Sequence, residues 1–496
     1  MQIILASSEV VPFAKTGGLA DVCGALPVEL EKLGHEAIVF LPAYTQAINC
    51  GLELNETSVE FDIPVGAKLH KGQLLESKLP GSNVRVYLVR QPNFFERDGL
   101  YAQDGEDFGD NCARFTFFCR SILEAIRLLD LKPDLIHAND WQTGLLPAYL
   151  KTEFATLPVY NNISTLFTIH NLAYQGSFWH WDILLTGMDW KYFNWREMEF
   201  FGRLNLLKTG LVFADKISTV SPTYAKEIQG VEQGCGLQGV LQDRSEDLVG
   251  ILNGIDSTSW NPALDSHLPV QFGAENWQAG KAQCKSHLQQ RLGLKQDPKV
   301  PLVGIVGRLA AQKGWSLILP IIKSWLETRD VQWAILGTGD ADYHVVLETL
   351  NCNYPTKIAA KLEFSNELAH QIEAGADMFV MPSEYEPCGL NQMYSMAYGT
   401  VPVVRSTGGL ADTVIDCNVE NCANGTANGF QFDEFSTSAL EKCLDRAVNR
   451  YLEEKDTWSD LVHRGMTTDW SWTQSAKRYE SLYQEILNAR KGQRLA

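Results

Sequence analysis

The residues with the clearest chemical potential are two cations in the stretch GRLAAQKG. Arg308 and Lys313 stand in a loop after an apolar run, with Gly307 and Gly314 beside them. Arginine can bind two anionic oxygens at once, lysine acts as a point charge, and a following helix offers free N–H groups. The set suits a diphosphate, although the same residues could also be two solvated surface charges.

A second group of polar residues lies in SEYEPCGL, between an apolar run and a helical stretch. It holds Glu384, Glu386 and Cys388, and Pro387 and Gly389 predict a sharp turn. A carboxylate in such a turn can accept hydrogen bonds from substrate hydroxyls or stabilise a developing positive charge. We expect such a role for Glu386, whereas Glu384 is better explained as a solvated loop carboxylate.

Other loops carry glycine pairs or histidines at the ends of apolar runs. KTGGLADV fits neither the G-x-G-x-x-G nor the G-x-x-x-x-G-K-[ST] pattern, although its lysine and glycines suit an anion site. The His and Asp spacings match no metal pattern, and the absence of G-x-S-x-G disfavours acyl hydrolysis. We therefore expect no metal. The candidates in these loops are Lys15, Gly17, Gly18, His137, Asp140, His170, Asn171, Gly408 and Gly409.

Length and charge narrow the classes of protein further. A chain of 496 residues predicts two or three domains. The net charge of −18 disfavours binding to nucleic acid or to an anionic membrane. No apolar run reaches membrane-spanning length, and the chain begins in a strand without a signal or transit peptide. We expect a cytoplasmic protein, or a plastid stromal protein whose transit peptide was removed.

The 11 cysteines favour reduced thiols. Their odd number and the lack of a C-x-x-C pair are typical of free thiols, not of a disulfide framework. The closest pair, Cys417 and Cys422, could form a bridge, which is the less favoured alternative.

The elements that position these loops alternate in type along the chain. Apolar runs such as QIILA, EAIVFLP and DLIHAN, separated by helical patterns, predict parallel strands buried on both faces. A polar stretch follows residue 262, and the same pattern restarts at VPLVGIVG. We predict doubly wound α/β domains at residues 1–262 and 263–470, with an amphipathic helix at 471–496 returning to the first domain.

The most unusual composition is FWHWDILLTGMDWKYFNW. Clustered aromatic residues in a globular chain are most simply a packed flap or core. The alternative is a surface on which sugar rings stack, because tryptophan and tyrosine suit their apolar faces.

Seven motifs together resemble the bacterial and plastid glycogen and starch synthases, which transfer glucose from ADP-glucose. KTGGLADV, TIHNLAYQG, TVSPTYAKEI, ILNGIDSTSWNP, VGRLAAQKG, EPCGLNQM and STGGLADTV occur in the family's order over residues 15–414. The resemblance implies a GT-B fold, two Rossmann-like domains facing a deep cleft, with the nucleotide held mainly by the C-terminal domain. It implies retaining transfer of glucose from ADP-glucose to the non-reducing end of an α-1,4-glucan or maltooligosaccharide, without a cofactor.

The resemblance also implies roles for individual residues. Arg308 and Lys313 would neutralise the ADP leaving group, and Glu386 would lie beside the transferred glucose. His170 and Asp140 would contact the same sugar. The substrate-binding positions implied are Lys15, Gly17, Gly18 and Asp21 near the phosphates or the reacting hydroxyl, Asn171, Cys388, Gly389, Leu390, Thr407, Gly408 and Gly409 near the donor, Phe364 on the base, and Tyr101 and Asn111 near the acceptor.

The chain departs from the family pattern at several of these motifs. Glu384 stands where many members have arginine, and Asn391 stands where many have threonine. HANDW and LKTG also replace the more common HAHDW and LKGG. Because the Glu384 change removes a cation near the nucleotide, UDP-glucose stays open as an alternative donor.

Three other classes of protein are alternatives to this resemblance, and each makes a different requirement of the chain. An NAD-dependent dehydrogenase would need G-x-G-x-x-G after the first strand, and that motif is missing. A glucan phosphorylase would need a lysine-bound pyridoxal phosphate, and nothing marks such a lysine. A non-catalytic glucan-binding protein would bind glucan and release no ADP.

Overall fold

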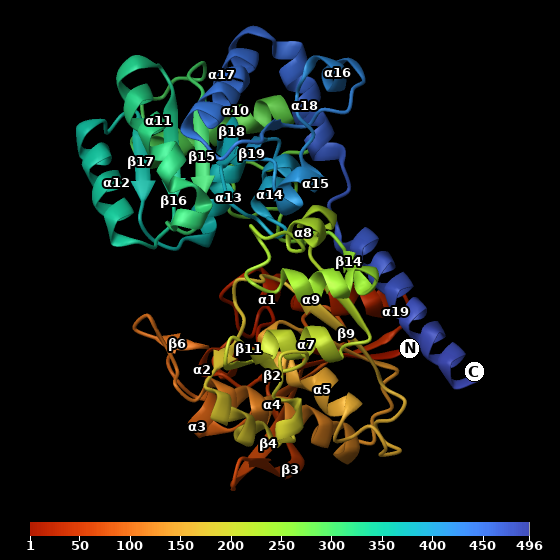
Figure 1. Ribbon diagram of the computed structural model, residues 1–496. Helices are drawn as coiled ribbons and strands as arrows, with labels where there is room; N and C mark the ends of the chain where they lie inside the picture. Colours follow the sequence, from red (N-terminus) through yellow and green to blue (C-terminus); the bar gives the residue numbers. More distant parts are fainter. Residues whose placement is uncertain (496) are drawn as a thin grey trace. The chain divides into compact units, whose positions relative to one another are not determined.

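The computed structural model describes residues 1–495, and the chain forms two compact units (Figure 1). Unit 1 comprises Met1–Val220, Ala225–Asn253 and the C-terminal segment from Trp472. Unit 2 comprises Ser221–Tyr224 and Gly254–Ser471. The segment Ser221–Tyr224 lies within the motif TVSPTYAKEI. The sequence did not predict that this segment belongs to unit 2.

The main sheet of unit 1 has a parallel centre and an antiparallel edge. Its strands are ordered β14-β13-β9-β8-β1-β2-β5-β4-β3, and only β5–β4 and β4–β3 pair antiparallel. In this order the strands are β14 (Leu248–Gly250), β13 (Lys216–Thr219), β9 (Ser164–Ile169), β8 (Leu135–Asn139), β1 (Gln2–Ala6), β2 (Glu36–Pro42), β5 (Arg85–Arg90), β4 (Lys68–Lys78) and β3 (Asn55–Val65). Two small sheets join β10 (Ser177–Phe178), β12 (Arg203–Asn205) and β11 (Glu199–Phe200), and β6 (Ala102–Gln103) and β7 (Glu106–Asp107).

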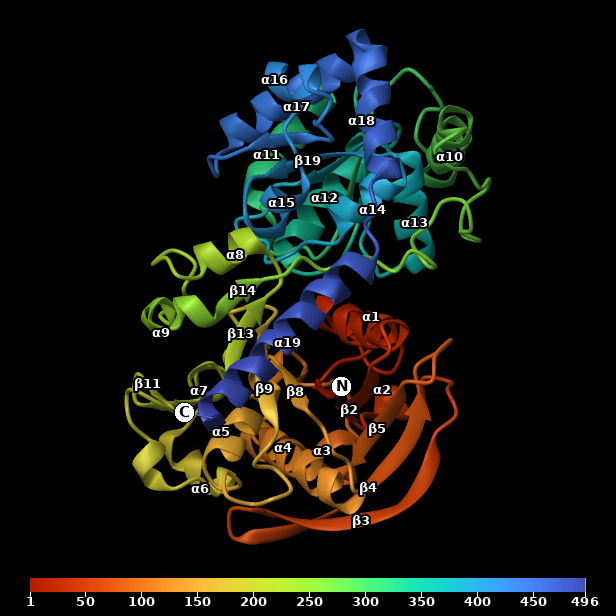
Figure 2. The ribbon, with the colours of Figure 1, turned by 90° about the vertical axis from the view of Figure 1, so that its right-hand side faces the viewer.

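Helices pack against this sheet because its central strands are apolar throughout. α4 contacts β3, β4 and β5, whereas α19 contacts α1 and β9 (Figure 2). The helices are α1 (Gly18–Lys32), α2 (Thr45–Ile48), α3 (Pro92–Phe95), α4 (Asn111–Leu128), α5 (Leu145–Lys151), α6 (Ile183–Thr186), α7 (Leu206–Phe213), α9 (Gln238–Asp243) and α19 (Trp472–Leu495), with 3-10 turns η1 (Trp141–Thr143), η2 (His180–Asp182), η3 (Trp190–Tyr192) and η4 (Ser245–Asp247). α8 (Pro222–Glu227) contains residues of both units.

Helix α19 is bound to unit 1 by polar contacts as well as by packing. The Tyr483 hydroxyl lies 2.9 Å from Nδ1 of His137, a buried residue of β8. His35 Nε2 lies 2.9 Å from a Glu480 carboxylate oxygen, and Ser475 Oγ donates to the Leu252 carbonyl. His137 is thereby a structural residue of the buried layer beneath α19, not a group at the sheet edge.

Unit 2 is built on a fully parallel six-stranded sheet. The order is β17-β16-β15-β18-β19-β20, so the chain crosses from one half of the sheet to the other between β17 and β18. The strands are β15 (Leu302–Val306), β16 (Gln332–Leu336), β17 (Ile358–Lys361), β18 (Met378–Met381), β19 (Val401–Arg405) and β20 (Phe430–Phe432). The helices are α10 (Trp277–Leu292), α11 (Trp315–Thr328), α12 (Ala341–Asn353), α13 (Asn366–Gly375), α14 (Asn391–Ala397), α15 (Gly408–Thr413), α16 (Val419–Ala423), α17 (Thr437–Glu453) and α18 (Lys455–Thr467), with the turn η5 (Ala311–Lys313).

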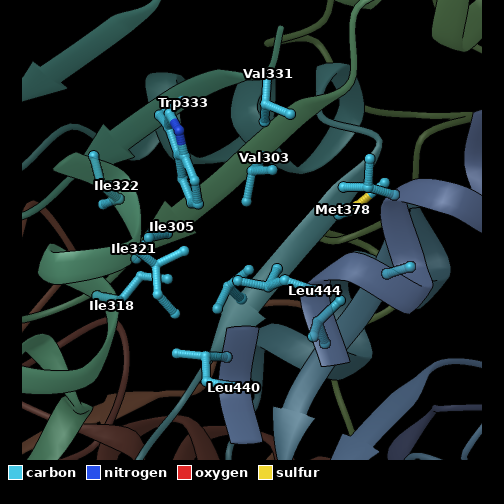
Figure 3. Packing of buried hydrophobic residues seen from close by; sticks show 14 of the residues in the cluster. Val303, Ile305, Ile318, Ile321, Ile322, Val331, Trp333, Met378, Leu440 and Leu444 are labelled. Atoms are coloured by element: carbon cyan, nitrogen blue, oxygen red, sulfur yellow. The ribbon is translucent and has the colours of Figure 1, made fainter. Parts of the chain in front are cut away.

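The core of unit 2 lies between this sheet and helices α11 and α17. Figure 3 shows side chains from β15, β16 and β18 meeting those of the two helices. Burial of one such aliphatic side chain contributes about 1.5–3 kcal/mol to folding. The cluster includes Val303, Ile305, Ile318, Ile321, Ile322, Trp333, Met378, Leu440 and Leu444.

The cysteine pair of unit 2 corrects the expectation of reduced thiols. Cys417 and Cys422 form a disulfide across the start of α16. The Asn418 side chain caps this helix by accepting from the Asn421 N–H at 2.8 Å, and the resulting turn brings the two cysteine Cα atoms to 5.6 Å. The prediction was wrong for this pair, whereas the other nine cysteines, all within the described residues, form no disulfide.

Within residues 1–495, no helix combines the length and apolar character that a membrane span needs.

Candidate functional site

The candidate residues of unit 2 follow three neighbouring parallel strands. The loop with Arg308 and Lys313 follows β15, the loop with Glu386 follows β18, and the loop with Thr407 follows β19. These strands are adjacent in the sheet, so their carboxyl ends place all three loops at one edge.

The centre of this edge is an ion pair between Lys313 and Glu386. Lys313 Nζ lies 2.6 Å from Glu386 Oε2, and Ser383 Oγ donates to the same oxygen at 2.9 Å. Glu386 is buried, whereas the Lys313 side chain is 27% exposed and can still meet a ligand. The pair places a carboxylate beside an ammonium. Such an arrangement suits a substrate that carries both negative and positive groups.

The glycines of STGGL have a packing role as well as a position at the site. A Cβ on Gly408 would stand 1.9 Å from the Glu386 carbonyl oxygen, and one on Gly409 would stand 2.0 Å from that of Cys388. Gly409 N–H donates to the Glu386 carbonyl at 3.1 Å. Because any side chain would separate the loops, these glycines keep Thr407 and its neighbours against the Glu386 turn.

The other predicted residues of unit 2 differ in accessibility. Arg308 is exposed, and among the described residues its guanidinium forms no ion pair. Phe364, just after β17, is 90% exposed, so both faces of its ring are accessible. Glu384 is exposed and Cys388 is buried, while Gly389 and Leu390 lead into α14 and are partly buried.

The candidate residues of unit 1 share a sheet edge in the same way. Asp140 follows β8, His170 and Asn171 follow β9, and the loop that ends in KTGG follows β1. β1, β8 and β9 are adjacent and parallel. Two of these residues are directly bonded, because the His170 N–H donates to Asp140 Oδ1 at 2.7 Å.

Asp140 is held in an uncommon backbone conformation. Its φ is 57°, a region that few non-glycine residues adopt, and its N–H donates to the Thr168 carbonyl. His170 Nε2 lies 2.9 Å from Asn139 Oδ1, while Asn139 Nδ2 donates to the Ala6 carbonyl. The surrounding hydrogen bonds must overcome the strain of this conformation. Residues held in it cluster at functional sites.

Burial sets the charge of both side chains. Desolvation raises the pKa of Asp140 to about 7, and the nearby Glu9 carboxylate adds to the rise. Desolvation also lowers the pKa of His170 to about 3, so its ring is neutral at physiological pH and Nε2–H donates to Asn139. Asp140 is therefore a carboxylate that titrates near neutrality, and His170 is a hydrogen-bonding group without charge.

The structure reveals a buried acid, Glu9, that sequence reasoning missed. Its carboxylate accepts hydrogen bonds from the backbone N–H groups of Thr16 and Gly17 and from the Thr16 and Tyr101 hydroxyls. These bonds tie the KTGG loop to the Tyr101 loop. The only sequence signal was the position of Glu9 three residues beyond an apolar strand, which many loop residues share. Ser383 was missed for the same reason.

The Tyr101 and Asn111 side chains have different environments. The Tyr101 hydroxyl contacts Glu9 and Ser8, at 2.8 and 2.7 Å. Asn111 is buried, its Nδ2 donates to the Tyr101 carbonyl, and its Oδ1 accepts from Arg114 at 2.6 Å. The Asn111 amide thus holds the Tyr101 loop in place.

Lys15 lies three residues before α1, in an exposed ion pair. Its Nζ is 2.7 Å from Asp21 Oδ1, and the Lys15 side chain is 49% exposed. Gly17 and Gly18 are exposed, with open space where a Cβ would stand. Within unit 1 the structure therefore brings together Lys15 with Asp21, Asp140 with His170, and, through Glu9, the KTGG loop with Tyr101. Among the described residues, no group of three or more His, Cys, Asp or Glu could hold a metal ion.

Comparison with known proteins identifies the family. The chain matches the model of the starch synthase catalytic domain over residues 2–243 and that of glycosyl transferases group 1 over residues 288–460. It is 44% identical to a glycogen synthase of Rhodopirellula baltica, over 100% of this chain and 99% of the relative. It is 46% identical to a glycogen synthase of Anaeromyxobacter dehalogenans, over 99% of this chain and 100% of the relative. The chain belongs to the glycogen and starch synthase family.

A solved structure agrees with membership of the glycogen and starch synthase family. The catalytic domain of starch synthase IV from Arabidopsis thaliana, bound to ADP and acarbose, matches with a TM-score of 0.90 and 33% identity. The match covers 98% of this chain and 99% of that chain. It confirms the predicted GT-B-type fold of two α/β units. This chain is accordingly a glycosyltransferase that transfers glucose to a glucan.

Proposed function

We propose that the chain transfers glucose from ADP-glucose to the non-reducing end of an α-1,4-glucan with retention of the anomeric configuration. The observation that carries the proposal is the Lys313–Glu386 pair, with Arg308 exposed at the same sheet edge. A diphosphate needs cations, and a glucose that develops positive charge at C1 needs a nearby carboxylate. The related starch synthase IV structure contains ADP, which supports an adenine nucleotide as the product.

In the proposed reaction each side chain of the site has one role. The C1–O bond to ADP breaks, and the electron pair leaves with the diphosphate, whose charge Arg308 and Lys313 offset. The acceptor hydroxyl attacks C1 from the face that ADP leaves and gives its proton to the departing phosphate oxygen. Glu386 stabilises the cationic sugar. The family resemblance assigns the same sugar to Asp140, which adds a negative charge, and to neutral His170, which hydrogen-bonds to the sugar hydroxyls. No carboxylate is proposed as a covalent nucleophile, in contrast to retaining hydrolases.

The decisive experiment measures ADP release with ADP-glucose and a maltooligosaccharide together. We expect release to require both compounds, with UDP-glucose a poorer donor and the oligosaccharide lengthened by one residue per ADP. Binding of glucan without release of ADP would overturn the proposal in favour of a non-catalytic binding protein. A faster reaction with UDP-glucose than with ADP-glucose would overturn the assignment of ADP-glucose as the donor.

The pKa of Asp140 predicts a pH dependence of the reaction. The carboxylate form predominates above about pH 7, and protonation below that value removes the charge that stabilises the sugar. We expect kcat/KM to fall by about tenfold per pH unit below that point, and Asp140→Asn to be slow at every pH without this limb. Initial rates between pH 5.5 and 9 test this. If the Asp140→Asn variant keeps the acidic limb, the limb belongs to another group. The matched control is Asp243→Asn, which changes an exposed aspartate of α9.

Lys15 is predicted to act in turnover more than in nucleotide binding. Its exposed ion pair with Asp21 contributes little to stability, so Lys15→Ala should fold normally. We expect kcat to fall by about tenfold or more while the Kd for ADP changes less than threefold. Calorimetric titration with ADP and initial rates provide the two values, with Lys32→Ala at the other end of α1 as control. Equal loss in both would make the KTGG loop a primary nucleotide site.

By its resemblance to the family, the chain is also proposed to act in the cytoplasm or the plastid stroma and to need no cofactor.

A further inference from the structure

A row of partly exposed aromatic rings lies on unit 1 between β10 and β11. Trp179, Trp181 and Trp190 are 59%, 47% and 44% exposed, and Phe193 is partly buried. We call these four residues the aromatic row. Of the packed flap or core that composition favoured, a core does not hold for side chains exposed to this degree. Large aromatic side chains gathered at a surface mark binding sites.

The rings of the aromatic row contact one another in sequence. The centroids of Trp179 and Trp181 are 6.4 Å apart, those of Trp181 and Trp190 are 5.1 Å apart, and those of Trp190 and Phe193 are 5.1 Å apart. The last two pairs are inclined by only 34° and 32°. The row is therefore a continuous apolar track, not a set of isolated side chains.

Local hydrogen bonds hold the backbone that carries the row. The Asp189 carboxylate accepts from the Lys191 N–H at 2.9 Å and caps η3. Asn194 Nδ2 donates to the Lys191 carbonyl and to Glu197 Oε2, at 2.8 and 2.6 Å. A surface that is already ordered loses less conformational entropy when a ligand binds.

Ring contacts connect the neighbourhood of the aromatic row to the candidate residues of the same unit. Phe178 is the last residue of β10 and directly precedes Trp179, and its ring lies 5.7 Å from that of Trp141. The Trp141 ring is in turn 6.3 Å from that of Tyr101, and Trp141 directly follows Asp140. The aromatic row therefore begins one residue beyond a set of ring contacts that leads to Tyr101 and Asp140, the residues proposed to bind the end of the polymer.

We propose that the aromatic row binds an α-1,4-glucan chain at a distance from the residues that react. The inference rests on the proposed function for the identity of the polymer. Pyranose rings have apolar faces that stack on aromatic rings and hydroxyls at their edges, which can reach neighbours such as Asp189 and Lys191. The net charge of −18 and the acids within the segment disfavour an anionic membrane as the occupant.

The test compares Trp179→Ala/Trp190→Ala with the wild type in glucan binding without donor. We expect glycogen retention in affinity electrophoresis to weaken by about tenfold, because two of the rings on which sugars stack are removed. The KM for glycogen should rise similarly, whereas kcat with maltotriose and the KM for ADP-glucose stay unchanged. Phe201→Ala removes an 83% exposed ring outside the row and should match the wild type.

The tyrosine variant Trp179→Tyr/Trp190→Tyr keeps the rings and should retain most of the binding. Unchanged glycogen binding in the alanine variant would overturn the inference. So would an equal loss of maltotriose activity, or a change in sedimentation that marks the row as an interface between two copies of the chain. A wild-type protein that binds glycogen through these residues yet releases no ADP would contradict the proposed function and leave the glucan surface standing.

Discussion

Replacing Lys313 by alanine is expected to lower kcat by about 30- to 1000-fold, which corresponds to ~2–4 kcal/mol of lost charge stabilisation. The ammonium lies in the loop after β15, partly exposed, with one contact to Glu386 at 2.6 Å. Its remaining N–H groups can reach a diphosphate as charge grows on the leaving oxygen. The effect should exceed the loss in ground-state ADP affinity, because the added charge exists only in the transition state.

The measurement is the initial rate of ADP release, with the Kd for ADP from calorimetry. Lys323→Ala removes an exposed lysine of the following helix α11 and should leave both values unchanged. Lys313→Arg should recover part of the rate, because it restores the charge with different geometry. Near wild-type turnover in the alanine variant would remove Lys313 from the mechanism.

The apolar strands of both sheets were predictable because burial on both faces leaves uninterrupted apolar runs. This holds for β1, β2, β8 and β9 in unit 1 and for β15, β16, β18 and β19 in unit 2. The hairpin β3–β4 was not predicted. It forms an edge where alternate residues are exposed, and it carries many charged residues, so it has no apolar run.

The positions of the site residues were predictable, but not their partners. Motifs at strand ends indicate an edge of the sheet. The pairing of Lys313 with Glu386, 73 residues apart, depends on β15 and β18 being neighbours although β16 and β17 intervene in the chain. Glu9 likewise meets Tyr101, 92 residues later, because the sheet order β1-β2-β5 brings the loop after β1 near the segment that follows β5. Such contacts follow from strand order, which local patterns do not contain.

Glu386→Gln is expected to lower kcat by about 100- to 1000-fold while ADP binds as tightly as in the wild type or more tightly. The amide keeps an acceptor for Ser383, whose hydroxyl lies 2.9 Å from Glu386 Oε2. It loses the charge that stabilises the sugar, and it frees Lys313 from its ion partner for the diphosphate. Turnover and nucleotide affinity should therefore move apart, whereas in Lys313→Ala both fall.

The double variant tests whether the two groups act as one unit. Because Lys313 and Glu386 are in contact, the loss in Lys313→Ala/Glu386→Gln should be smaller than the product of the two single losses. Additive losses, or weaker ADP binding in Glu386→Gln, would contradict the roles given to the pair. Glu384→Gln is the matched control. Its carboxylate is exposed two residues earlier in the same loop, so a large loss of turnover there would move the catalytic role from the buried acid to the exposed one.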